Sequence, residues 1–305
     1  MPSIANLGYV GYAKFGKINS PVRVTSADLH LAQSVTKPDI IDGKTDKTVY
    51  ILGPKIIEGG LSFPAVHDQA TGVISSIWNM AVQRDADGRI SNDDINVKYA
   101  TGVSYKYTDC IINTLEMSVT QQATLDVTLN VMGKDRITGD TTEPSYSYRN
   151  TRAITWNDII FGISSSSLNV AGSETRQFSI NINNDADRYY TFNRLLAPQD
   201  LAPRKREITG TMEIMGRNLG LANLALTNQN RCHEDGVIRF GYELGGLTSA
   251  TGCAGSWVVE IPGCVFEIET LNLTNNLFVT TVNYHALPGI TFGSEGRSTN
   301  FVVSS

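Results

Sequence analysis

Residues that most often perform catalysis or bind metals are few in this 305-residue chain. No two cysteines are spaced as CxxC, which zinc ribbons and thiol redox sites require, and no HExxH or GxSxG motif occurs. The cysteines are therefore expected to be reduced thiols that pack as small apolar residues. The histidines and cysteines are His30, His67, His233, His285, Cys110, Cys232, Cys253 and Cys264.

Three short stretches look like ligand sites but lack part of the required chemistry. Gly43-Lys44-Thr45 ends like a phosphate-binding loop, yet Pro38 stands where the first glycine belongs, so the backbone cannot wrap a phosphate. Asp85-Ala86-Asp87-Gly88 has its glycine too early for a calcium loop and predicts a turn after a helix. Cys232-His233-Glu234 has no partner cluster nearby and predicts a loop. We expect no catalytic residue, no cofactor and no metal site.

The composition indicates a packed and weakly charged protein. Hydrophobic residues make up 41% of the chain, enough for a core, whereas charged residues make up only 18%. With 25 Lys and Arg against 30 Asp and Glu, the net charge is -5, which argues against a protein that grips nucleic acid over its whole surface. No apolar run approaches the ~20 residues of a membrane span, and the first residues lack the pattern of a signal peptide. We expect no membrane contact and assembly in the cytosol.

Strand patterns dominate the chain. From Leu125 to Val131, odd positions are apolar and even positions polar, as in a half-buried strand. Helical spacing is clear over Val73–Val82 and weaker over Leu219–Thr227. The fold is expected to be mainly β, with β-barrel or β-sandwich modules that each carry a short flanking α-helix. The predicted strands are Val22–Val24, Thr48–Leu52, Gly102–Tyr107, Leu115–Val119, Ala123–Val131, Gln177–Ile182, Glu207–Met215, Gly236–Leu244, Trp257–Ile261 and Phe278–Tyr284.

The second half of the chain resembles the first at an offset of 154 residues. CIINTLEMSVTQQATL, from Cys110, aligns without gaps with CVFEIETLNLTNNLFV, from Cys264. Each copy reads as a strand, a tight turn at an amide pair and a second strand. The apolar residues change parity along the first strand of each copy, which predicts a bulge.

Upstream of these hairpins the correspondence is looser. A glycine, Gly60 or Gly210, lies in a strand of each half, and Ile90 aligns with Ile238 after the helical segments. Shared strand composition is the alternative to a true repeat. The repeat predicts two modules, residues 1–140 and 151–305, with a linker at 141–150. It also predicts that the matched cysteines are buried at equivalent positions.

One stretch of the second half carries a resemblance to a known family. FSININNDADRYYTFNRLLAPQDLAPRKREITGTMEI resembles the signature of tail tube proteins of long-tailed bacteriophages. In that family an asparagine-rich strand, here Phe178–Asn184, precedes a long loop and a strand with the pattern of Ile208–Thr211. IPGCVFEIETLNLT and YTDCIINTLEMSV resemble a further strand of the same family. The resemblance implies a non-enzymatic virion protein, assembled in the host cytoplasm.

The resemblance also implies how the protein works. Tail tube proteins stack as rings around a channel for phage DNA, and their inner wall is a barrel that strands of every subunit close. An acidic lumen would repel phosphate, so that DNA slides without specific binding. Two modules per chain favour a trimeric, pseudo-hexameric ring, with a hexamer as the alternative. The implied partners are further copies, the tape measure protein and the tail terminator.

Two groups of residues are candidates for these roles. The polar hairpin positions are expected to face the lumen, although a solvated strand face explains them equally well. Charged residues of two long segments are expected at contacts between subunits or rings. The lumen candidates are Glu116, Asp126, Glu267 and Glu269. The contact candidates are Asp39, Lys44, Arg188, Arg194, Arg204, Lys205 and Arg206.

Two other classes of protein remain as alternatives. A tube protein of a bacterial contractile injection or secretion machine would share the channel but pass proteins. A β-rich carbohydrate-binding protein or hydrolase would need a concave site with paired carboxylates at a fixed separation, and the sequence has no such arrangement.

Overall fold

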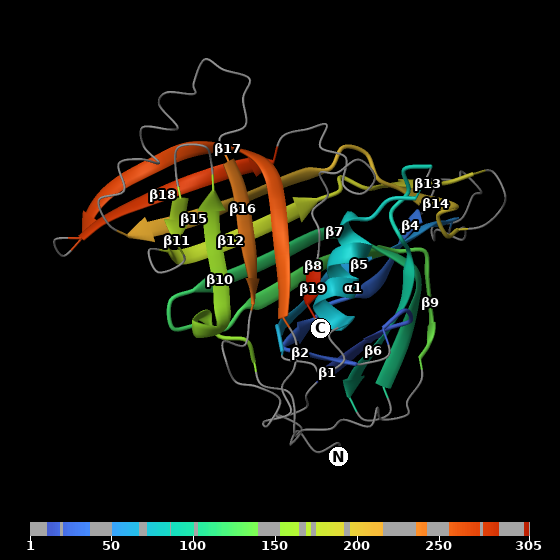
Figure 1. Cartoon of the computed structure of the whole chain (residues 1–305). Helices are drawn as coiled ribbons and strands as arrows, with labels where there is room; N and C mark the ends of the chain where they lie inside the picture. Colours follow the sequence, from blue (N-terminus) through green and yellow to red (C-terminus); the bar gives the residue numbers. More distant parts are fainter. Residues whose placement is uncertain are drawn as a thin grey trace, which may run out of the picture.

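The computed structural model shows a protein built mainly of antiparallel strands (Figure 1). Among the described residues there is one α-helix. The described residues are 11–18, 21–36, 51–66, 72–85, 87–100, 103–139, 153–164, 169–171, 175–191, 196–215, 236–242, 256–274, 277–286 and 302–304.

The elements follow one another along the chain as follows. The first half contains β1 (Gly11–Phe15), β2 (Val22–Val24), β3 (Ser26–Ala27), β4 (His30–Thr36), β5 (Ile51–Pro64), α1 (Gly72–Val82), β6 (Asp93–Ala100), β7 (Val103–Thr120), β8 (Asp126–Gly133) and β9 (Asp135–Thr138). The second half contains the 3-10 helix η2 (Trp156–Asp158), β10 (Ile159–Ser164), β11 (Asn169–Ala171), β12 (Thr175–Asn183), β13 (Asp187–Tyr189), β14 (Asp200–Ala202), β15 (Glu207–Met215), β16 (Gly236–Tyr242), β17 (Ser256–Thr274), β18 (Leu277–Ala286) and β19 (Val302–Ser304).

A continuous run of antiparallel strands crosses both halves of the chain. The order is β4–β5–β8–β7–β12–β15–β18–β17, and we call this run the long sheet. In Figure 1 it extends from β4 at one end to β17 and β18 at the other. The pairing of β7 with β12 joins the two halves, and we call that junction the internal seam.

The two longest strands each pair with two sets of neighbours. The first part of β7 pairs with β6, which continues to β1 and β2. The first part of β17 pairs with β16, which continues to β10 and β11. The later parts of β7 and β17 pair with β8 and β18 in the long sheet. The pairings of the described residues never return to their starting strand, so the barrel that the sequence predicts for each half is not closed within one chain.

Alternation along the strands places the core on one face of the long sheet. Leu125 and Leu129 are fully buried, as the alternating pattern predicts, whereas Asp126 and Asn130 between them are exposed. Phe178 of β12 packs against three further aromatic rings, Phe161, Phe240 and Tyr284, with centroids 4.5–5.9 Å away. These contacts place the core of the second half directly beneath β12.

A glycine allows the closest packing in this core. Gly210 of β15 lies directly opposite Tyr284 of β18, and both residues are buried. The Tyr284 hydroxyl reaches past Gly210 to β12, the strand on the other side of β15, and donates to the Ser179 carbonyl oxygen at 2.8 Å. A Cβ at position 210 would lie closer than 3.0 Å to that oxygen and to the tyrosine ring. The ring therefore occupies the space that a side chain at 210 would need.

Helix α1 confirms the predicted helical segment and covers the core face beside β7. Ile77 and Trp78 are almost completely buried. The predicted turn after this helix is also confirmed, because the Asp85 carboxylate accepts from the backbone N–H groups of Asp87 and Arg89 at 3.0 and 2.8 Å. The weaker predicted segment, Leu219–Thr227, lies outside the described residues.

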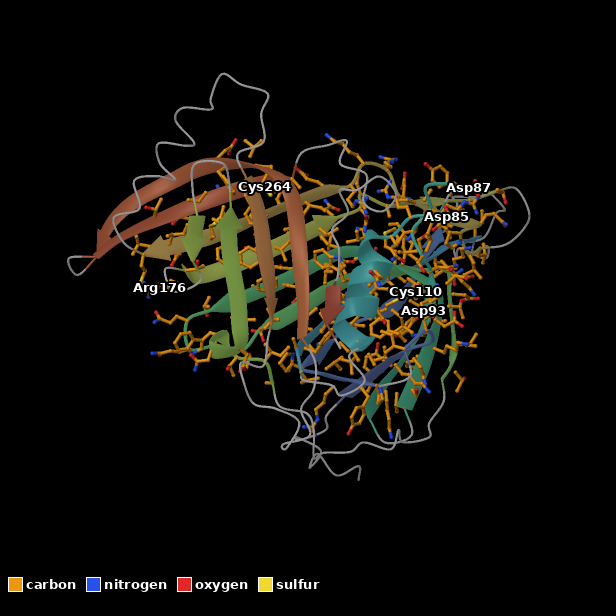
Figure 2. The ribbon with its side chains drawn as sticks, in the orientation of Figure 1. Asp85, Asp87, Asp93, Cys110, Arg176 and Cys264 are labelled. Carbon is orange, nitrogen blue, oxygen red and sulfur yellow. The ribbon has the colours of Figure 1, made fainter. Side chains whose placement is uncertain are left out.

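The matched cysteines are both buried, and neither is in a disulfide. Figure 2 shows Cys110 among the strands of the first half and Cys264 among those of the second. The register of β7 against β6 shifts between Tyr107 and Cys110, and that of β17 against β16 shifts between Ile261 and Cys264. Each cysteine therefore follows a bulge at the same place in its strand.

Both buried thiols are expected to react slowly in the native protein. Burial removes water from Cys110 and raises the pKa of its thiol, so little thiolate is present at neutral pH. Alkylation of Cys110 and Cys264, followed by mass spectrometry, should be about 100-fold slower in native than in unfolded protein. An Asp87→Cys variant, placed in the exposed turn, should label rapidly and serves as the control. Rapid native labelling of both natural cysteines would contradict their burial.

Candidate functional site

The exposed face of the long sheet is lined by polar side chains in register across the strands, and we call it the polar face. One row starts at Glu116 of β7, which lies opposite Thr128 of β8 and Asn181 of β12. Asn181 in turn lies opposite Thr209 of β15, and Thr209 opposite His285 of β18. The register of four pairings therefore brings together polar residues from both halves of the chain.

A second row runs parallel to the first and carries a carboxylate near each end. It contains Asp126, Ser118, Ser179, Thr211, Asn283 and Glu267, each opposite the next. The hydroxyls of Ser179 and Thr211 lie 2.8 Å apart and form a hydrogen bond between β12 and β15. Glu207 and Glu213 of β15 lie in the flanking rows, opposite Asn183 and Gln177. Neither described row contains Lys or Arg.

The structure places three of the four lumen candidates on this face. Glu116, Asp126 and Glu267 are exposed. The Glu267 carboxylate lies 3.9 Å from Nε2 of His285, which would pair with it when protonated. Glu269 lies where the register of β17 against β18 shifts, and its side chain is outside the described part of the chain. That these residues face a lumen stays a prediction.

A shallow cavity of about 320 Å³ on the polar face is lined by Glu116, Ser179, Thr211 and His285 among others. Glu116 and His285 are its titratable carboxylate and imidazole, and they stand three strands apart in the register. Three strand spacings amount to about 14 Å, so the two groups cannot share a proton or hold one reacting atom between them. The arrangement is a hydrated surface of hydroxyls and amides rather than an acid–base pair.

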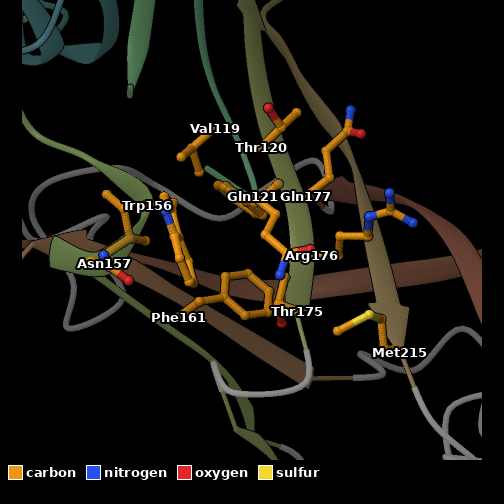
Figure 3. A pocket seen from close by; sticks show the side chains of 12 residues that line it. Val119, Thr120, Gln121, Trp156, Asn157, Phe161, Thr175, Arg176, Gln177 and Met215 are labelled. Carbon is orange, nitrogen blue, oxygen red and sulfur yellow. The ribbon is translucent and has the colours of Figure 1, made fainter. Parts of the chain in front are cut away.

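A second cavity, of about 270 Å³, opens where β10 and β12 lie beside η2 (Figure 3). Trp156 and Phe161 form an aromatic wall, and Arg176 and Gln177 lie on the other side. No carboxylate, histidine or cysteine lines it. Among its lining residues, the hydroxyls of Thr120 and Thr175 therefore have no histidine or carboxylate beside them that would activate them.

Metal-ligating groups are dispersed in the described part of the chain. No three His, Cys, Asp or Glu side chains among the described residues gather closely enough to hold a metal ion. Within the same residues, no helix has the length and apolar character that a membrane crossing requires. Two of the stretches examined in the sequence, Gly43-Lys44-Thr45 and Cys232-His233-Glu234, lie outside the described residues.

Residues 184–206, which carry most of the contact candidates, fold back in their described part onto the first half of the same chain; we call them the strap. Arg188 donates from Nη2 to the Ile57 carbonyl oxygen and pairs with Glu58, both at 3.0 Å. Arg204 pairs with Asp187 inside the strap. Lys205 is exposed.

The end of the strap also contacts helix α1. Arg206 donates to the Val82 carbonyl oxygen at the last residue of α1. Burial, together with the nearby Arg84, lowers the pKa of Arg206 to about 10. Contacts of the strap with another copy stay a prediction. The other contact candidates, Asp39, Lys44 and Arg194, lie outside the described residues.

One buried amide fixes the start of the strap. Asn184 is completely buried, and its Nδ2 donates to Ala81 of α1 at 2.9 Å and to Ile112 of β7 at 3.0 Å. Leu201, farther along the strap, packs with Ile111 and Met132 and so covers one end of the polar face. The strap thus bounds the polar face and joins the helix to the sheet.

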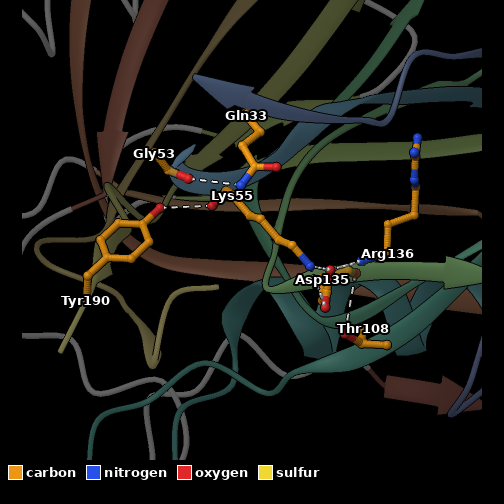
Figure 4. Close-up of polar contacts among 7 residues, drawn as sticks. All are labelled: Gln33, Gly53, Lys55, Thr108, Asp135, Arg136 and Tyr190. Carbon is orange, nitrogen blue, oxygen red and sulfur yellow. Dashed lines mark hydrogen bonds and ion pairs between the residues drawn. The ribbon is translucent and has the colours of Figure 1, made fainter. Parts of the chain in front are cut away.

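Figure 4 shows how the strap meets the edge of the first half. The Tyr190 hydroxyl donates to the Lys55 carbonyl oxygen at 3.0 Å, and the Lys55 ammonium pairs with Asp135 at 2.8 Å. Partial burial acts to raise the pKa of Asp135, but hydrogen bonds from Lys55 and the Arg136 backbone outweigh it and lower that pKa. Gln33 of β4 donates to Gly53 of β5 at 3.0 Å and closes the corner.

Most residues of the polar face belong to no sequence motif for catalysis or metal binding. The hairpin pattern points to their acidic residues but not to the hydroxyl and amide side chains of neighbouring strands, among them Ser179, Asn181 and Thr209. His285, which stands three strands from Glu116, belongs to no motif of the sequence that would assign it to this face. The available signal is the alternation in FSININ and EITGTME, whose polar positions fall on this face.

Comparison with known proteins agrees with this architecture. A family model described as "Phage tail tube protein" matches residues 52–248, which is more than half of the chain. The match includes β5 through β16, and with them the internal seam, the strap and Gly210. No curated protein matches the sequence. The chain therefore belongs to the phage tail tube protein family and is a structural component of a virion tail.

Proposed function

We propose that copies of this protein assemble into stacked rings whose lumen conducts phage DNA. The observation that carries the proposal is the polar face, which continues across both halves of the chain with carboxylates and without Lys or Arg in its two central rows. A surface of hydroxyl, amide and carboxylate groups stays hydrated and repels phosphate, so DNA passes without being held. The protein has no catalytic role in this proposal.

We further propose that the chain consists of two tandem tube modules, residues 1–140 and 151–305. In support, β5–β8–β7 pair in the same order as β15–β18–β17, and β6 and β16 then lead to β1 and β10. Three copies would then supply six modules around the channel, so the favoured ring is a trimer with pseudo-sixfold symmetry and the alternative is a hexamer. Rings would form in the host cytoplasm together with the tape measure and tail terminator proteins.

Negative-stain electron microscopy of concentrated protein tests ring formation directly. The proposal expects rings or tubes with an axial channel, either spontaneously or after addition of the initiating tail proteins. Mass photometry of single rings would separate three copies of the 33.2 kDa chain from six. A protein that stays monomeric even with those partners present would overturn the proposal.

Reversing the charge of the polar face is expected to slow DNA release and to leave assembly intact. In Glu116→Lys and Asp126→Lys combined, each new ammonium attracts phosphate where a carboxylate repelled it, and both residues lie on strands inside the long sheet. Triggered release from phage that carry this variant should be about tenfold slower at low salt, and high salt should reduce the difference. Fluorescence of a DNA-binding dye measures the release.

Asp87→Lys, which reverses a charge in the turn after α1, is the control and should release DNA at the normal rate. If the double variant assembles and releases DNA normally, these residues do not face the lumen. If it fails to assemble, they belong to contacts between copies.

A further inference from the structure

The long sheet ends in two strands that each have a neighbour on one side only. At one end, β3 and β4 pair with β5 and with no other strand of the described residues. At the other end, the part of β17 after Cys264 pairs with β18 alone among those residues. Unpaired strand edges expose rows of N–H and C=O groups that invite pairing with another chain.

The internal seam shows how one such pair of strands fits together. In it, β12 pairs antiparallel with the later part of β7 over seven residue pairs, from Gln177 opposite Thr120 to Asn183 opposite Thr114. The backbone hydrogen bond from Asn184 N–H to the Asn113 oxygen, at 2.8 Å, continues this ladder at one end. The bond from Gln121 N–H to the Arg176 oxygen, at 2.9 Å, continues it at the other.

The two free edges occupy the places that β7 and β12 occupy in this seam. β17 relates to β18 as β7 relates to β8, because Phe266 lies opposite Tyr284 where Ile112 lies opposite Val131. β17 is thus the counterpart of β7.

The edge formed by β3 and β4 can be compared with β12 in the same way. Gly59 lies opposite Val131 as Gly210 lies opposite Tyr284, which aligns β5 with β15. His30 then corresponds to Asn181, and β3 and β4 together are the counterpart of β12.

We propose that β17 of one copy pairs antiparallel with β3 and β4 of the next copy, in the register of the internal seam. This inference rests on the proposed ring and names its joint. The register sets Thr270 opposite His30 and Glu267 opposite Ala32 of the next copy. At Leu29, which would lie opposite Leu271, the carbonyl oxygen already accepts from the Tyr99 and Tyr107 hydroxyls at 2.7 and 2.5 Å, so the hydrogen-bonded part of the joint is β4. The joint is head-to-tail, since two different edges meet, and such joints close into rings when the rotation permits.

Burial along β4 supports this pairing. Ile180 and Ile182 of β12 are completely buried in the internal seam. Their counterparts on the free edge are Leu29, which is buried, and Leu31, which remains partly exposed. The adjacent strand of the internal seam buries Ile182, whereas Leu31 has no such strand beside it. A strand of another copy on this edge would bury Leu31 in the same way.

The charges along the two edges are compatible with the same register. His30 and Asp28 are exposed on the polar side of the edge. The register places Thr270 and Asn272 opposite them, and Glu267 opposite Ala32. No position in the register sets two like charges opposite each other, so the joint avoids the repulsion that selects against wrong pairings.

Disulfide trapping in assembled rings tests the register. Asn183 and Thr114 form a pair without mutual hydrogen bonds, because the ladder bonds fall at Asn184 and Asn113, and such pairs bring Cα atoms to about 4.5 Å. The corresponding pair between copies is Ala32 and Glu267. The variant Ala32→Cys with Glu267→Cys should therefore form disulfides between chains upon mild oxidation, seen as covalent dimers and higher species in denaturing gels.

Two matched variants complete the experiment. Thr114→Cys with Asn183→Cys places the same geometry in the internal seam and should cross-link within one chain. Leu31→Cys with Glu267→Cys puts the two thiols on opposite faces and should give no covalent dimer.

Electron microscopy of the unmodified protein separates two kinds of failure. Suppose that the unmodified protein forms rings and that the internal pair cross-links, but that Ala32→Cys with Glu267→Cys gives no covalent dimer. This register would then be wrong, and the proposed function would still stand. An unmodified protein that never forms rings would overturn the proposed function and this inference with it.

Discussion

Replacing Gly210 with alanine is expected to destabilise the protein by roughly 3 kcal/mol, which would lower the unfolding temperature by roughly 5 °C. The added methyl would meet the Ser179 carbonyl oxygen and the Tyr284 ring, each closer than 3.0 Å. Neither can move freely, because the oxygen belongs to a paired strand and the ring is completely buried with its hydroxyl bound to that oxygen. Thermal or urea unfolding followed by circular dichroism measures the effect.

Gly60→Ala is the matched control, since Gly60 lies in the strand of the first half that corresponds to β15. There the nearest atom to a new Cβ is an Asp28 carboxylate oxygen at 3.2 Å. It belongs to an exposed side chain that accepts from the Gly60 N–H and needs to shift by only a few tenths of an ångström, and the next atom is a backbone oxygen at 3.5 Å. We expect this variant to lose about 1 kcal/mol or less. If both variants lose the same free energy of unfolding, close packing against Tyr284 is not what requires glycine at position 210.

Replacing Leu31 with proline is expected to abolish ring formation while leaving the monomer folded. Asp28 N–H donates to the Gly60 oxygen at 3.1 Å, so alternation directs the N–H of Leu31 away from β5, toward the free edge. Proline is tolerated on an edge strand at such a position, because no hydrogen bond inside the chain is lost. It removes a donor that the joint with β17 of the next copy would use. Electron microscopy and sedimentation velocity report assembly, and circular dichroism reports folding.

Leu31→Ala separates the lost donor from the lost side chain. It removes the apolar contact but keeps the N–H group, so rings should still form, at a higher protein concentration. Normal rings from the proline variant would show that β4 is not part of the joint. Loss of rings in both variants, with intact monomers, would assign the effect to packing instead of the backbone ladder.

Local elements could be predicted from the sequence because short-range patterns determine them. The strands Val22–Val24 and Glu207–Met215 and the helix over Val73–Val82 form almost where the patterns place them. The predicted strands Gly102–Tyr107 and Leu115–Val119, in contrast, are parts of one strand, β7. The bulges within it reverse the side-chain alternation and read in the sequence as a break between strands.

Register between distant segments could not be predicted in this way. By sequence, Ile90 aligns with Ile238. In the structure the counterpart of Ile238 is Ile95, because Ile95 lies opposite Tyr107 as Ile238 lies opposite Ile261. Loops of unequal length in the two halves shift the alignment by five residues, and only the ladder hydrogen bonds restore it. The expected bulge after each matched cysteine is real, but it falls at Asn113 in β7 and at Glu269 in β17.

The acidic residues of the polar face could be predicted from the sequence, but the set of strands that form this face could not. Glu116, Asp126 and Glu267 share one face because three separate strands pair in register, and no single segment shows that. Asn184 carried no recognisable signal, since a buried amide that joins a helix to a sheet resembles any other asparagine in a turn. The need for glycine in the family-like pattern ITGT is explained only by the structure, in which Tyr284 lies opposite Gly210.

The internal seam has a consequence for how rings would grow. Because β7 and β12 belong to one chain, their seam closes at the effective concentration that the connecting segment sets, on the order of millimolar, however dilute the protein is. Each joint between β17 and β4 of another copy instead depends on encounters in solution. In a ring of three copies, half of the seams would therefore already exist before the first encounter, and dilution would dissociate only the other half. Two modules in one chain would thus lower the concentration at which a closed ring outcompetes its open fragments.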